Sequence, residues 1–424
     1  MTRLASNVWP IALAAALIAG PALGAGFGIF EQGTKAMGTA GAFTGQADDL
    51  SAMFHNVGGL AFAGERSLYA GLTLINPLES TFSGADPFPG TGARAEVDTA
   101  VFTPVHVYWA KPLSDRLTFG AALYSPFGLS VEWDDPDSFP GRFISTKSEL
   151  VSFDLNANVG YKINDRVGVG FGIIGRAAEV ELRRRVPVVN PFDQTVFDAA
   201  RVVLKSDFDF GLGFNAGLLY KVNPRFSWGV SYRSEIDVDF GGDGRFTQLP
   251  SGNAQLDALV ARSLPFGGPI PISTSIDFPA MASLGASVGL TPNTRLNADV
   301  NWTGWSSFDV VDLDFRGAPA LNTSLVQDYD DAYNYRLGVT WTTAKGNQVR
   351  FGYVFDETPQ PDETTGPVLP DADRNGFTVG FGTRRFDVAA MYLLFDDRTT
   401  TVNRDGFFGT YNTEVALFAF SWKL

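Results

Sequence analysis

Short segments in which apolar and polar residues alternate recur along almost the whole chain. In the clearest one, apolar side chains occupy every second position from Val151 to Tyr161, with Ser, Asp, Asn and Gly between them. Side chains of a β-strand point alternately to opposite faces, so this pattern predicts a sheet with one face against an apolar medium and the other lining a polar interior. Many such strands in one chain indicate a membrane β-barrel.

Fourteen candidate strands can be placed, and an even number is what a single-chain bacterial barrel requires. They span residues 67–75, 101–110, 117–126, 150–163, 167–179, 208–220, 226–237, 278–290, 296–308, 334–343, 349–355, 377–383, 386–395 and 413–424. We therefore predict an all-β fold, in which residues 65–424 form a 14-stranded antiparallel transmembrane barrel.

The links between these strands alternate between two kinds. Short turn-forming links lie at residues 114–116, 164–166, 223–225, 291–293, 345–347 and 384–385. Long links rich in Pro, Gly and Asp lie at residues 183–205, 241–276 and 358–374. Short periplasmic turns and long outer loops are the usual asymmetry of bacterial barrels.

Aromatic side chains gather on the face that we assign to lipid. One face of a single strand carries Phe226, Trp228, Val230 and Tyr232, and the last strand presents Phe418, Phe420, Trp422 and Leu424 together. Aromatic girdles at the two membrane interfaces are typical of outer-membrane barrels.

The N-terminus predicts export. Arg3 is followed by an apolar stretch too short to span a bilayer, and Ala22 and Gly24 are small residues suited to a signal-peptidase site. We expect residues 1–24 to be a signal peptide and the mature chain to begin at Ala25. No later run of about 18 apolar residues occurs, so the sequence predicts a barrel in a bacterial outer membrane, in contact with its lipid and lipopolysaccharide. The absence of cysteine suits the oxidising periplasm.

The net charge of the chain limits the classes of ligand that it can bind. The chain carries 46 acidic and 32 basic residues, a balance that argues against nucleic acid as a ligand.

Residues 25–64 do not alternate, and they contain nine glycines. Small residues from Gly33 to Ala42 would allow tight packing in a confined space, so we predict an N-terminal plug folded into the barrel lumen. The alternative is a disordered periplasmic tail, but such a tail would leave many apolar groups in water. These groups are Phe27, Ile29, Phe30, Met37, Phe43, Met53 and Phe54.

An ordered set of short motifs resembles the FadL/TodX (OmpP1) family of outer-membrane transporters for long-chain fatty acids and other hydrophobic compounds. The motifs are the start Ala25-Gly26-Phe27, G-T-A-G-A-F at 38–43, Y-S-P-F-G-L-S-V-E-W at 124–133, G-R-F at 141–143, K-S-E-L at 147–150, D-F-P-A-M-A-S-L-G-A-S at 277–287, W-T-G-W-S-S-F at 302–308 and L-P-D-A-D-R at 369–374. The resemblance covers the whole mature chain.

The resemblance implies a barrel closed by an N-terminal hatch, loops that capture the ligand, and a kink in the third strand that opens a lateral exit into the membrane. Gly120 and Pro126 are the residues able to break the ladder of that strand. The hatch departs from the family where an Asn-Pro-Ala segment is usual, because this chain has Asn56, Val57 and Gly58 there. We take Asn56, Gly58, Gly120 and Pro126 as hatch or gate residues.

Three arginines in the inward phase of their strands, Arg176, Arg336 and Arg350, are candidate partners for a carboxylate headgroup. Phe27 and Phe30 are candidates for the apolar end of the same site. The stronger expectation for any single arginine is an ion pair across the lumen. The available inward carboxylates are Asp154, Asp207, Asp209 and Asp299.

Signals for other chemistry are weak. The G-x-G-x-x-G at 170–175 lies within an alternating strand and opens no helix, so we do not expect a dinucleotide. The acidic run from Asp371 starts like an EF-hand loop but has Gly382 where a Glu is needed. Neither His55 nor His106 stands in a recognisable nucleophile setting. We expect no enzyme, cofactor or metal.

The sequence therefore predicts a monomeric passive transporter of hydrophobic compounds, with long-chain fatty acids as the first expectation. Two alternatives stay open: a general porin for small polar solutes, and an uptake channel specific for aromatic hydrocarbons. A porin would have an open lumen, whereas apolar residues such as Ile174, Val354 and Leu417 point inward here.

Overall fold

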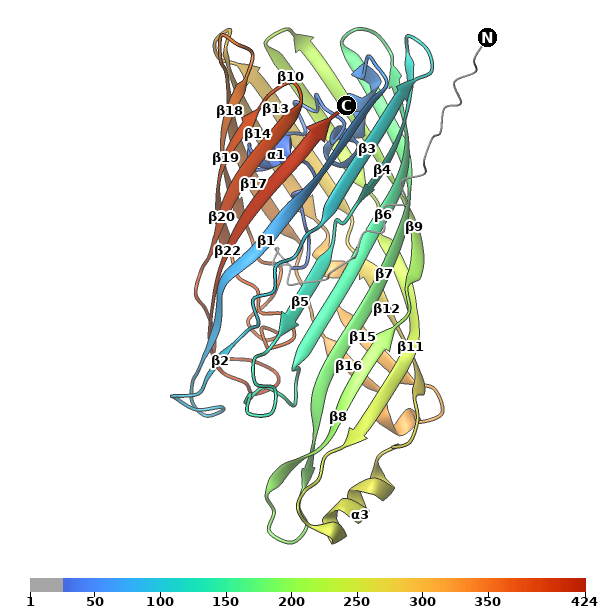
Figure 1. Cartoon of the computed structure of the whole chain (residues 1–424), viewed down its shortest axis with the longest axis vertical. Coiled ribbons are helices and arrows are strands. Elements are labelled where there is room, and N and C mark those ends of the chain that lie inside the picture. The colour runs from blue at the N-terminus through green and yellow to red at the C-terminus, as the bar shows by residue number, and fades with distance from the viewer. Residues whose placement is uncertain (1–25) are drawn as a thin grey trace, which may run out of the picture.

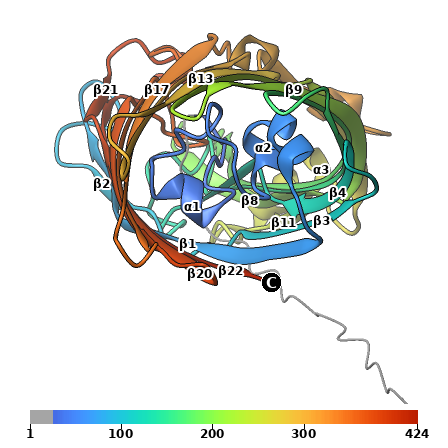
Figure 2. The same ribbon diagram turned by 90° about the horizontal axis from the view of Figure 1, so that it is seen from above.

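The computed structural model describes residues 26–424, and these form a closed ring of fourteen antiparallel strands (Figures 1 and 2). In order around the ring, the strands are β1 (Ser67–Gly84), β3 (Val105–Pro112), β4 (Leu117–Tyr124), β6 (Lys147–Lys162), β7 (Val167–Val189), β9 (Asp209–Asn223), β10 (Phe226–Arg233), β13 (Met281–Gly289), β14 (Thr294–Thr303), β17 (Ala332–Thr342), β18 (Gln348–Asp356), β19 (Arg374–Gly382), β20 (Phe386–Phe395) and β22 (Gly409–Lys423). The ring closes where β22 pairs with β1. The predicted fourteen-stranded barrel is confirmed, while the predicted signal peptide and the start at Ala25 lie outside the described residues.

The alternating pattern has the phase that the sequence predicted. On β6, Leu155 is 65% exposed on the outer wall, whereas the neighbouring Asp154 and Asn156 are fully buried in the lumen. Val354 and Leu417 are buried as well. Within residues 26–424, no helix has the length and apolar character needed to cross a bilayer.

Residues 26–64, which we call the hatch, lie inside the ring of strands (Figure 2). They sit toward the end of the barrel that carries the short turns and the C-terminus (Figure 1). The hatch contains three short helical elements, α1 (Thr34–Met37), α2 (Ala52–His55) and the 3-10 helix η1 (Val57–Phe62). We call residues 26–32 its leading segment and residues 34–64 its seated part.

A belt of inward-facing glycines lets the seated part approach the barrel backbone closely. A side chain at Gly170 would begin 2.2 Å from the Val57 carbonyl oxygen, and one at Gly160 would begin 2.5 Å from the Ala61 nitrogen. The other strands contribute Gly217 of β9, Gly229 of β10, Gly285 of β13, Gly338 of β17, Gly352 of β18 and Gly380 of β19. These strands therefore carry Gly inside where a larger residue would displace the hatch.

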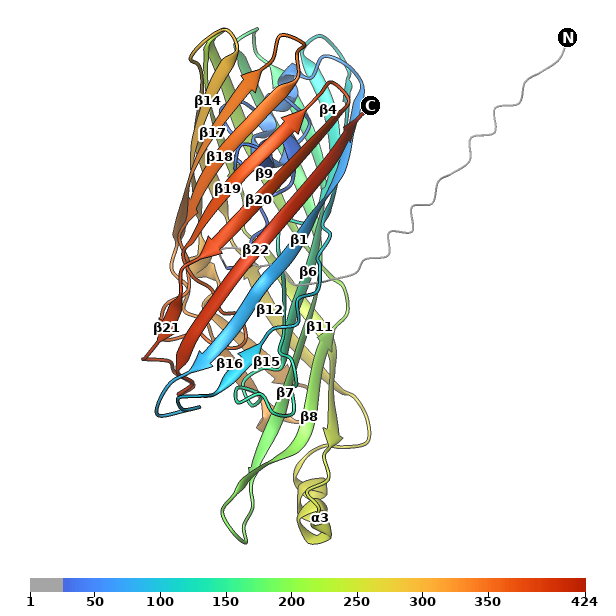
Figure 3. The same ribbon diagram turned by 60° about the vertical axis from the view of Figure 1, so that its left-hand side comes forward.

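The outer side of the barrel is more ordered than the sequence predicted. Two of the three long links that we read as loops are strand extensions that project beyond the rim (Figures 1 and 3). The extensions are built from the end of β7, β8 (Val196–Ser206), β11 (Ile236–Gln248), α3 (Ala254–Ser263) and β12 (Ile270–Phe278). The link between β14 and β17 adds β15 (Val310–Phe315), which pairs with β12, and β16 (Thr323–Val326). β7 runs through Pro187 because the ladder to β8 shifts register there, so the proline loses no partner.

The third long link and two short strands complete the outer side. Residues 358–373 hold no strand, although a bridge joins Gly366 and Leu369. Short strands β2 (Arg94–Glu96) and β21 (Arg398–Thr400) extend the β1–β22 wall.

The strand predicted at residues 296–308 ends earlier than expected. β14 ends at Thr303 rather than Phe308, and the 3-10 helix η2 (Trp305–Ser307) follows. Trp305 is 2% exposed and turns into the lumen, so burial of its large ring replaces continuation of the strand.

Candidate functional site

The wall is interrupted after β4. The ladder between β4 and β6 ends at Tyr124, and β5 (Gly128–Glu132) resumes pairing with β6 after three intervening residues that face only two. This bulge lies at Pro126. The ladder stays paired on both sides through Gly120, so Gly120, the second predicted break, is not one; a side chain there would meet Met53 of the hatch.

The leading segment of the hatch pairs with the interrupted strand. Ile29 N–H donates to the Pro126 carbonyl at 2.7 Å, and Gly128 N–H donates to the Phe27 carbonyl at 2.9 Å. The Gln32 side chain donates to the Ser125 carbonyl at 2.5 Å. At the kink, therefore, the hatch takes the hydrogen bonds that a neighbouring wall strand would otherwise supply.

Phe27, in the leading segment of the hatch, is the centre of an aromatic cluster. Its ring centroid lies 4.7 Å from Trp305, 5.0 Å from Phe308 and 5.8 Å from Phe127. Phe27 is 1% exposed, and edge-to-face geometry dominates these contacts.

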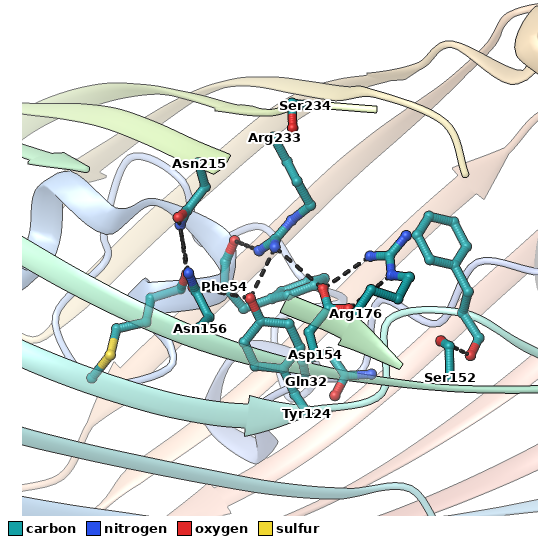
Figure 4. Close-up of polar contacts among 12 residues, drawn as sticks. Gln32, Phe54, Tyr124, Ser152, Asp154, Asn156, Arg176, Asn215, Arg233 and Ser234 are labelled. Carbon is teal, nitrogen blue, oxygen red and sulfur yellow. Dashed lines mark hydrogen bonds and ion pairs between the residues drawn. The ribbon is translucent and has the colours of Figure 1, made fainter. Parts of the chain in front are cut away.

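A charged centre lies directly beside the aromatic cluster (Figure 4). Arg176 donates through Nε and Nη2 to the two oxygens of Asp154, at 2.8 and 2.9 Å. Its guanidinium also stacks within 4.6 Å of Phe127 and 4.7 Å of Phe278. The ion pair expected as the alternative to ligand binding is thus present for Arg176.

Arg233 is a second guanidinium at the same carboxylate, and the sequence analysis missed it. Its Nη1 lies 3.6 Å from an Asp154 oxygen and donates to the Tyr124 hydroxyl at 2.8 Å. Arg233 is 4% exposed. Two buried guanidiniums therefore share one carboxylate, which leaves excess positive charge in the lumen. The sequence did contain a signal for Arg233: it follows the outward-facing Tyr232 on the same strand and must therefore point into the lumen.

A polar chain links this charged centre to the hatch. The Tyr124 hydroxyl donates to Asn156, Asn156 donates to Asn215, and Asn215 donates to the Met53 carbonyl at 3.0, 3.1 and 3.1 Å. Figure 4 shows these side chains converging from β4, β6 and β9.

Arg336 and Phe30 meet at a small cavity of about 30 Å³. The Arg336 guanidinium lies 4.6 Å from the Phe30 ring and donates to Asn334 and to the Ala40 carbonyl, both at 2.8 Å. Arg233 lines the same cavity. Two of the predicted site residues are thus brought together, and the cavity between them carries two guanidiniums.

Ionisable hatch groups near this cavity are shifted by burial. Burial, and then the positive charges of Arg336 and Arg233, lower the pKa of His55 to about 3, so His55 is neutral at physiological pH. Burial raises the pKa of Glu31 despite the opposing charges of Arg336 and Arg374.

Arg350 is not part of this site. It lies beneath α1, where a side chain at Gly38 would touch it, and pairs with Asp387 at 2.8 Å. Lys423 pairs with the same carboxylate at 2.5 Å. Arg350 therefore serves the contact between hatch and barrel.

The remaining predicted carboxylates do not pair with these arginines. Asp299 accepts the backbone N–H groups of Phe43 and Thr44 at 2.8 and 2.7 Å and so holds the hatch. Asp207 is exposed, and Asp209 accepts the Gly241 N–H at 2.7 Å on the outer side.

Asn56 and Gly58 belong to the seated part of the hatch. The Asn56 amide donates to the Thr44 carbonyl at 2.8 Å and to the Leu218 carbonyl at 3.0 Å. A side chain at Gly58 would begin 2.7 Å from the Leu219 nitrogen. Both residues fasten the hatch to β9.

A large apolar cavity of about 120 Å³ lies on the outer side of the aromatic cluster. Phe27 lines its inner end, and its walls are largely aliphatic and aromatic. They include Leu129, Leu150, Leu204, Phe240, Ile276, Phe308 and Leu313. Glu149 and Glu181 also line it, and Lys147 lies 2.9 Å and 3.9 Å from their carboxylates.

His106 lines the lumen as predicted, at 1% exposure, and its Nε2 lies 2.8 Å from the Ser421 hydroxyl. Ser421 also contacts Thr34 of α1 at 2.5 Å and is fully buried, so this Ser–His contact fastens the hatch. Among residues 26–424, no group of three His, Asp or Glu side chains is placed to hold a metal ion.

Comparison with known proteins gives consistent matches. The family model described as outer membrane protein transport protein (OMPP1/FadL/TodX) matches residues 15–423. The long-chain fatty acid transport protein of Escherichia coli O6:H1 is 26% identical over 407 residues, covering 90% of each chain. The 47 kDa outer membrane protein of Pasteurella multocida is 26% identical over 389 residues, covering 89% of this chain and 87% of that protein.

Solved structures show the same fold. A FadL homologue of Pseudomonas aeruginosa superposes with a TM-score of 0.80 at 21% identity, covering 94% of this chain and 99% of the other. The toluene transporter TbuX of Ralstonia pickettii superposes with a TM-score of 0.67 at 16% identity, covering 93% and 99%.

Proposed function

Because the chain belongs to the outer membrane protein transport protein family (OMPP1/FadL/TodX), whose members are transport channels and not enzymes, we propose that it takes up long-chain fatty acids across the bacterial outer membrane. The observation that carries this choice of substrate is the pair of buried guanidiniums, Arg176 and Arg233, that share Asp154 beside an apolar cluster. A carboxylate would supply the missing negative charge, and an alkyl chain would fill the apolar cavity.

The route begins at the large apolar cavity on the outer side. Burial of an alkyl chain there contributes about 0.8 kcal/mol per CH₂ group, which favours capture from water without an energy source. The ligand then moves inward past Phe27, which separates the cavity from the charged centre.

The headgroup site is the cavity lined by Arg233 and Arg336. Arginine binds carboxylates through paired, charge-assisted hydrogen bonds. Phe30 and Phe54 line the same cavity and offer apolar contacts next to the guanidiniums. His55 also lines this cavity, but because it is neutral it adds no positive charge to that of the two arginines.

Release occurs sideways at the kink. The strand interrupted at Pro126 is covered by the leading segment of the hatch, which is held there by backbone bonds and the Gln32 side chain. Displacement of the leading segment would expose an opening in the wall. Passage into lipid avoids returning the alkyl chain to water.

The test is binding of labelled hexadecanoate to purified protein and its uptake by intact cells. Arg233→Gln is expected to weaken hexadecanoate binding by about ten- to a hundredfold, since a hydrogen bond to a charged group contributes about 1.5–3 kcal/mol. Binding of the uncharged hexadecanol should be unchanged. Equal loss for both ligands would show that Arg233 shapes the fold instead of binding the headgroup.

Arg350→Gln is the matched control. Arg350 is also a buried lumen arginine, but it lies beneath α1 and away from both cavities. Its replacement should leave hexadecanoate binding unchanged. If wild-type cells took up no fatty acid and the protein gave a large ion conductance, a porin would replace this proposal.

A channel for aromatic hydrocarbons is the second candidate. The observation in its favour is the predominantly apolar wall of the large cavity, which needs no headgroup. Uptake of labelled toluene without uptake of hexadecanoate would select it.

A further inference from the structure

The barrel ladder is interrupted at a second place, between β9 and β11. Pairing of β9 with β10 ends at Asn215 and Arg233, and pairing of β8 with β11 begins at Ser206 and Gly242. β8 and β9 follow one another along the wall, as do β10 and β11, so both strands pass through the interruption. Residues 208–213 and 235–240 face each other there without register pairs.

The two strands overlap at this seam instead of meeting edge to edge. A side chain at Gly211 would begin 2.4 Å from the Asp237 carbonyl oxygen and 2.6 Å from Ile236. A side chain at Gly213 would begin 2.5 Å from Ile236. Two inward glycines therefore make room for β11 to pass beneath β9, and side-chain packing holds a stretch of wall where ladder pairing is lost.

The inner side of the seam is apolar, and so is the β9 half of its outer side. Inside, Ile236, Val238 and Phe240 are at most 2% exposed, and Phe240 lines the large cavity. Outside, Phe210 is 76% exposed and Leu212 is 79% exposed on the lipid-facing wall. The overlapped strands therefore separate the apolar outer face of β9 from the apolar cavity inside.

The outer rim of the seam is acidic. Asp237 and Asp239 are exposed on β11, and Asp209 on β9 bridges the seam by accepting the Gly241 N–H at 2.7 Å. A carboxylate would meet like charge at this rim, whereas an uncharged molecule would not.

We infer that the β9–β11 seam is a lateral opening through which uncharged hydrophobic molecules dissolved in the outer leaflet enter the large cavity. Such molecules would reach the cavity from the lipid, while fatty acids would reach it from the outer loops. The inference rests on the proposed function, transport of hydrophobic compounds, and adds a separate path for ligands without a headgroup.

A disulfide across the seam tests this inference, because the chain has no cysteine of its own. A side chain at Gly211 would begin 2.9 Å from a Val238 methyl carbon, so the pair Gly211→Cys and Val238→Cys is close enough to cross-link. Because that side chain would also begin 2.4 Å from the Asp237 carbonyl oxygen, the Gly211→Cys single variant measures the effect of the added side chain alone. Uptake of labelled hexadecane and hexadecanoate is measured in oxidised and reduced cells. These two probes have the same number of carbon atoms and differ in the carboxylate.

The cross-link should abolish hexadecane uptake, reduction should restore it, and hexadecanoate uptake should persist throughout. The control pair Val230→Cys and Leu284→Cys, on the outer face of the continuous β10–β13 ladder, should change neither. The single variants, checked for heat-modifiable migration on gels, separate cross-linking from misfolding.

Three outcomes would overturn the inference. Hexadecane uptake that survives the cross-link would show that the seam stays closed, and loss of both probes would show one shared path. If the wild type took up hexadecanoate but no hexadecane, the seam would carry no ligand while the proposed function stood. Uptake of neither probe by the wild type would count against the proposed function itself.

Discussion

The two parts of the hatch are held in the barrel by different means. The seated part rests backbone to backbone on the glycine belt and is fastened by buried side chains such as Asn56 and Asp299. The leading segment instead lies along the kinked strand, held by two backbone bonds at Phe27 and Ile29 and by Gln32. The backbone of the seated part lies against several strands, while the backbone of the leading segment pairs with one strand and only its side chains, such as Phe27 and Phe30, reach others.

This difference suggests that the seated part is a fixed barrier and that the leading segment is the movable gate. Movement of the seated part would break contacts with most of the barrel at once. Movement of the leading segment breaks fewer backbone contacts: a few hydrogen bonds, each with a net contribution of about 0.5–1.5 kcal/mol, and the contacts of the Phe27 ring. The predictions below test this division.

The largest effect is expected for Gly170→Ala. The new methyl group would begin 2.2 Å from the Val57 carbonyl oxygen, and overpacking of this kind costs about 1–3 kcal/mol. We expect the hatch to be displaced, with a lower unfolding temperature and a higher ion conductance in planar bilayers. Gly175→Ala on the same strand is the control, because the nearest atoms there lie 4.0 Å away. Equal behaviour of the two variants would contradict a fixed hatch.

Deletion of Pro126 is expected to abolish transport while the barrel still assembles. The deletion leaves two residues between β4 and β5 opposite two on β6, so the ladder can run on without the bulge. Hexadecanoate uptake should fall to the level of cells without the protein, and heat-modifiable migration should persist. Uptake at the wild-type level would rule out release at this kink.

Two disulfides compare the parts of the hatch directly. Gly28 and Phe127 are bridge partners, so Gly28→Cys with Phe127→Cys would lock the leading segment, and reduction should restore hexadecanoate uptake. Thr34→Cys with Ser421→Cys would lock the seated part, since the two hydroxyl oxygens lie 2.5 Å apart, and should leave uptake unchanged. The reverse result would place the moving element in the seated part. The single variants control for loss of the Phe127 ring.

The smallest effect concerns pH. Burial raises the pKa of Asp371 to about 6, and this carboxylate accepts the Gly26 N–H at 2.9 Å at the start of the leading segment. The folded protein therefore binds this proton more tightly than the unfolded chain, whose Asp has a pKa of about 3.9, and the contribution to stability falls as pH rises between these values. Relative to Asp371→Asn, the wild type should lose heat resistance between pH 4 and pH 7. If the difference in heat resistance between the two proteins did not change with pH, the raised pKa of Asp371 would be contradicted.

The barrel could be predicted from the alternating pattern alone. Alternation is a local property of each strand, so the strand count, the phase of side chains such as Leu155 and Asp154, and the short turns could all be read without knowing the neighbours. The apolar content of residues 25–64 likewise indicated a segment that must be buried.

Tertiary structure alone decided which inward residues work together. Arg233 shares Asp154 with Arg176 across three strands, Arg350 lies beneath α1, and Gly120 packs on Met53 instead of breaking its ladder. All of these residues face the lumen. The alternating pattern therefore could not distinguish residues that bind a headgroup from residues that hold the hatch. The reason is physical: lumen contacts join residues far apart in the chain through barrel closure, whereas periodicity reports only which face a side chain takes.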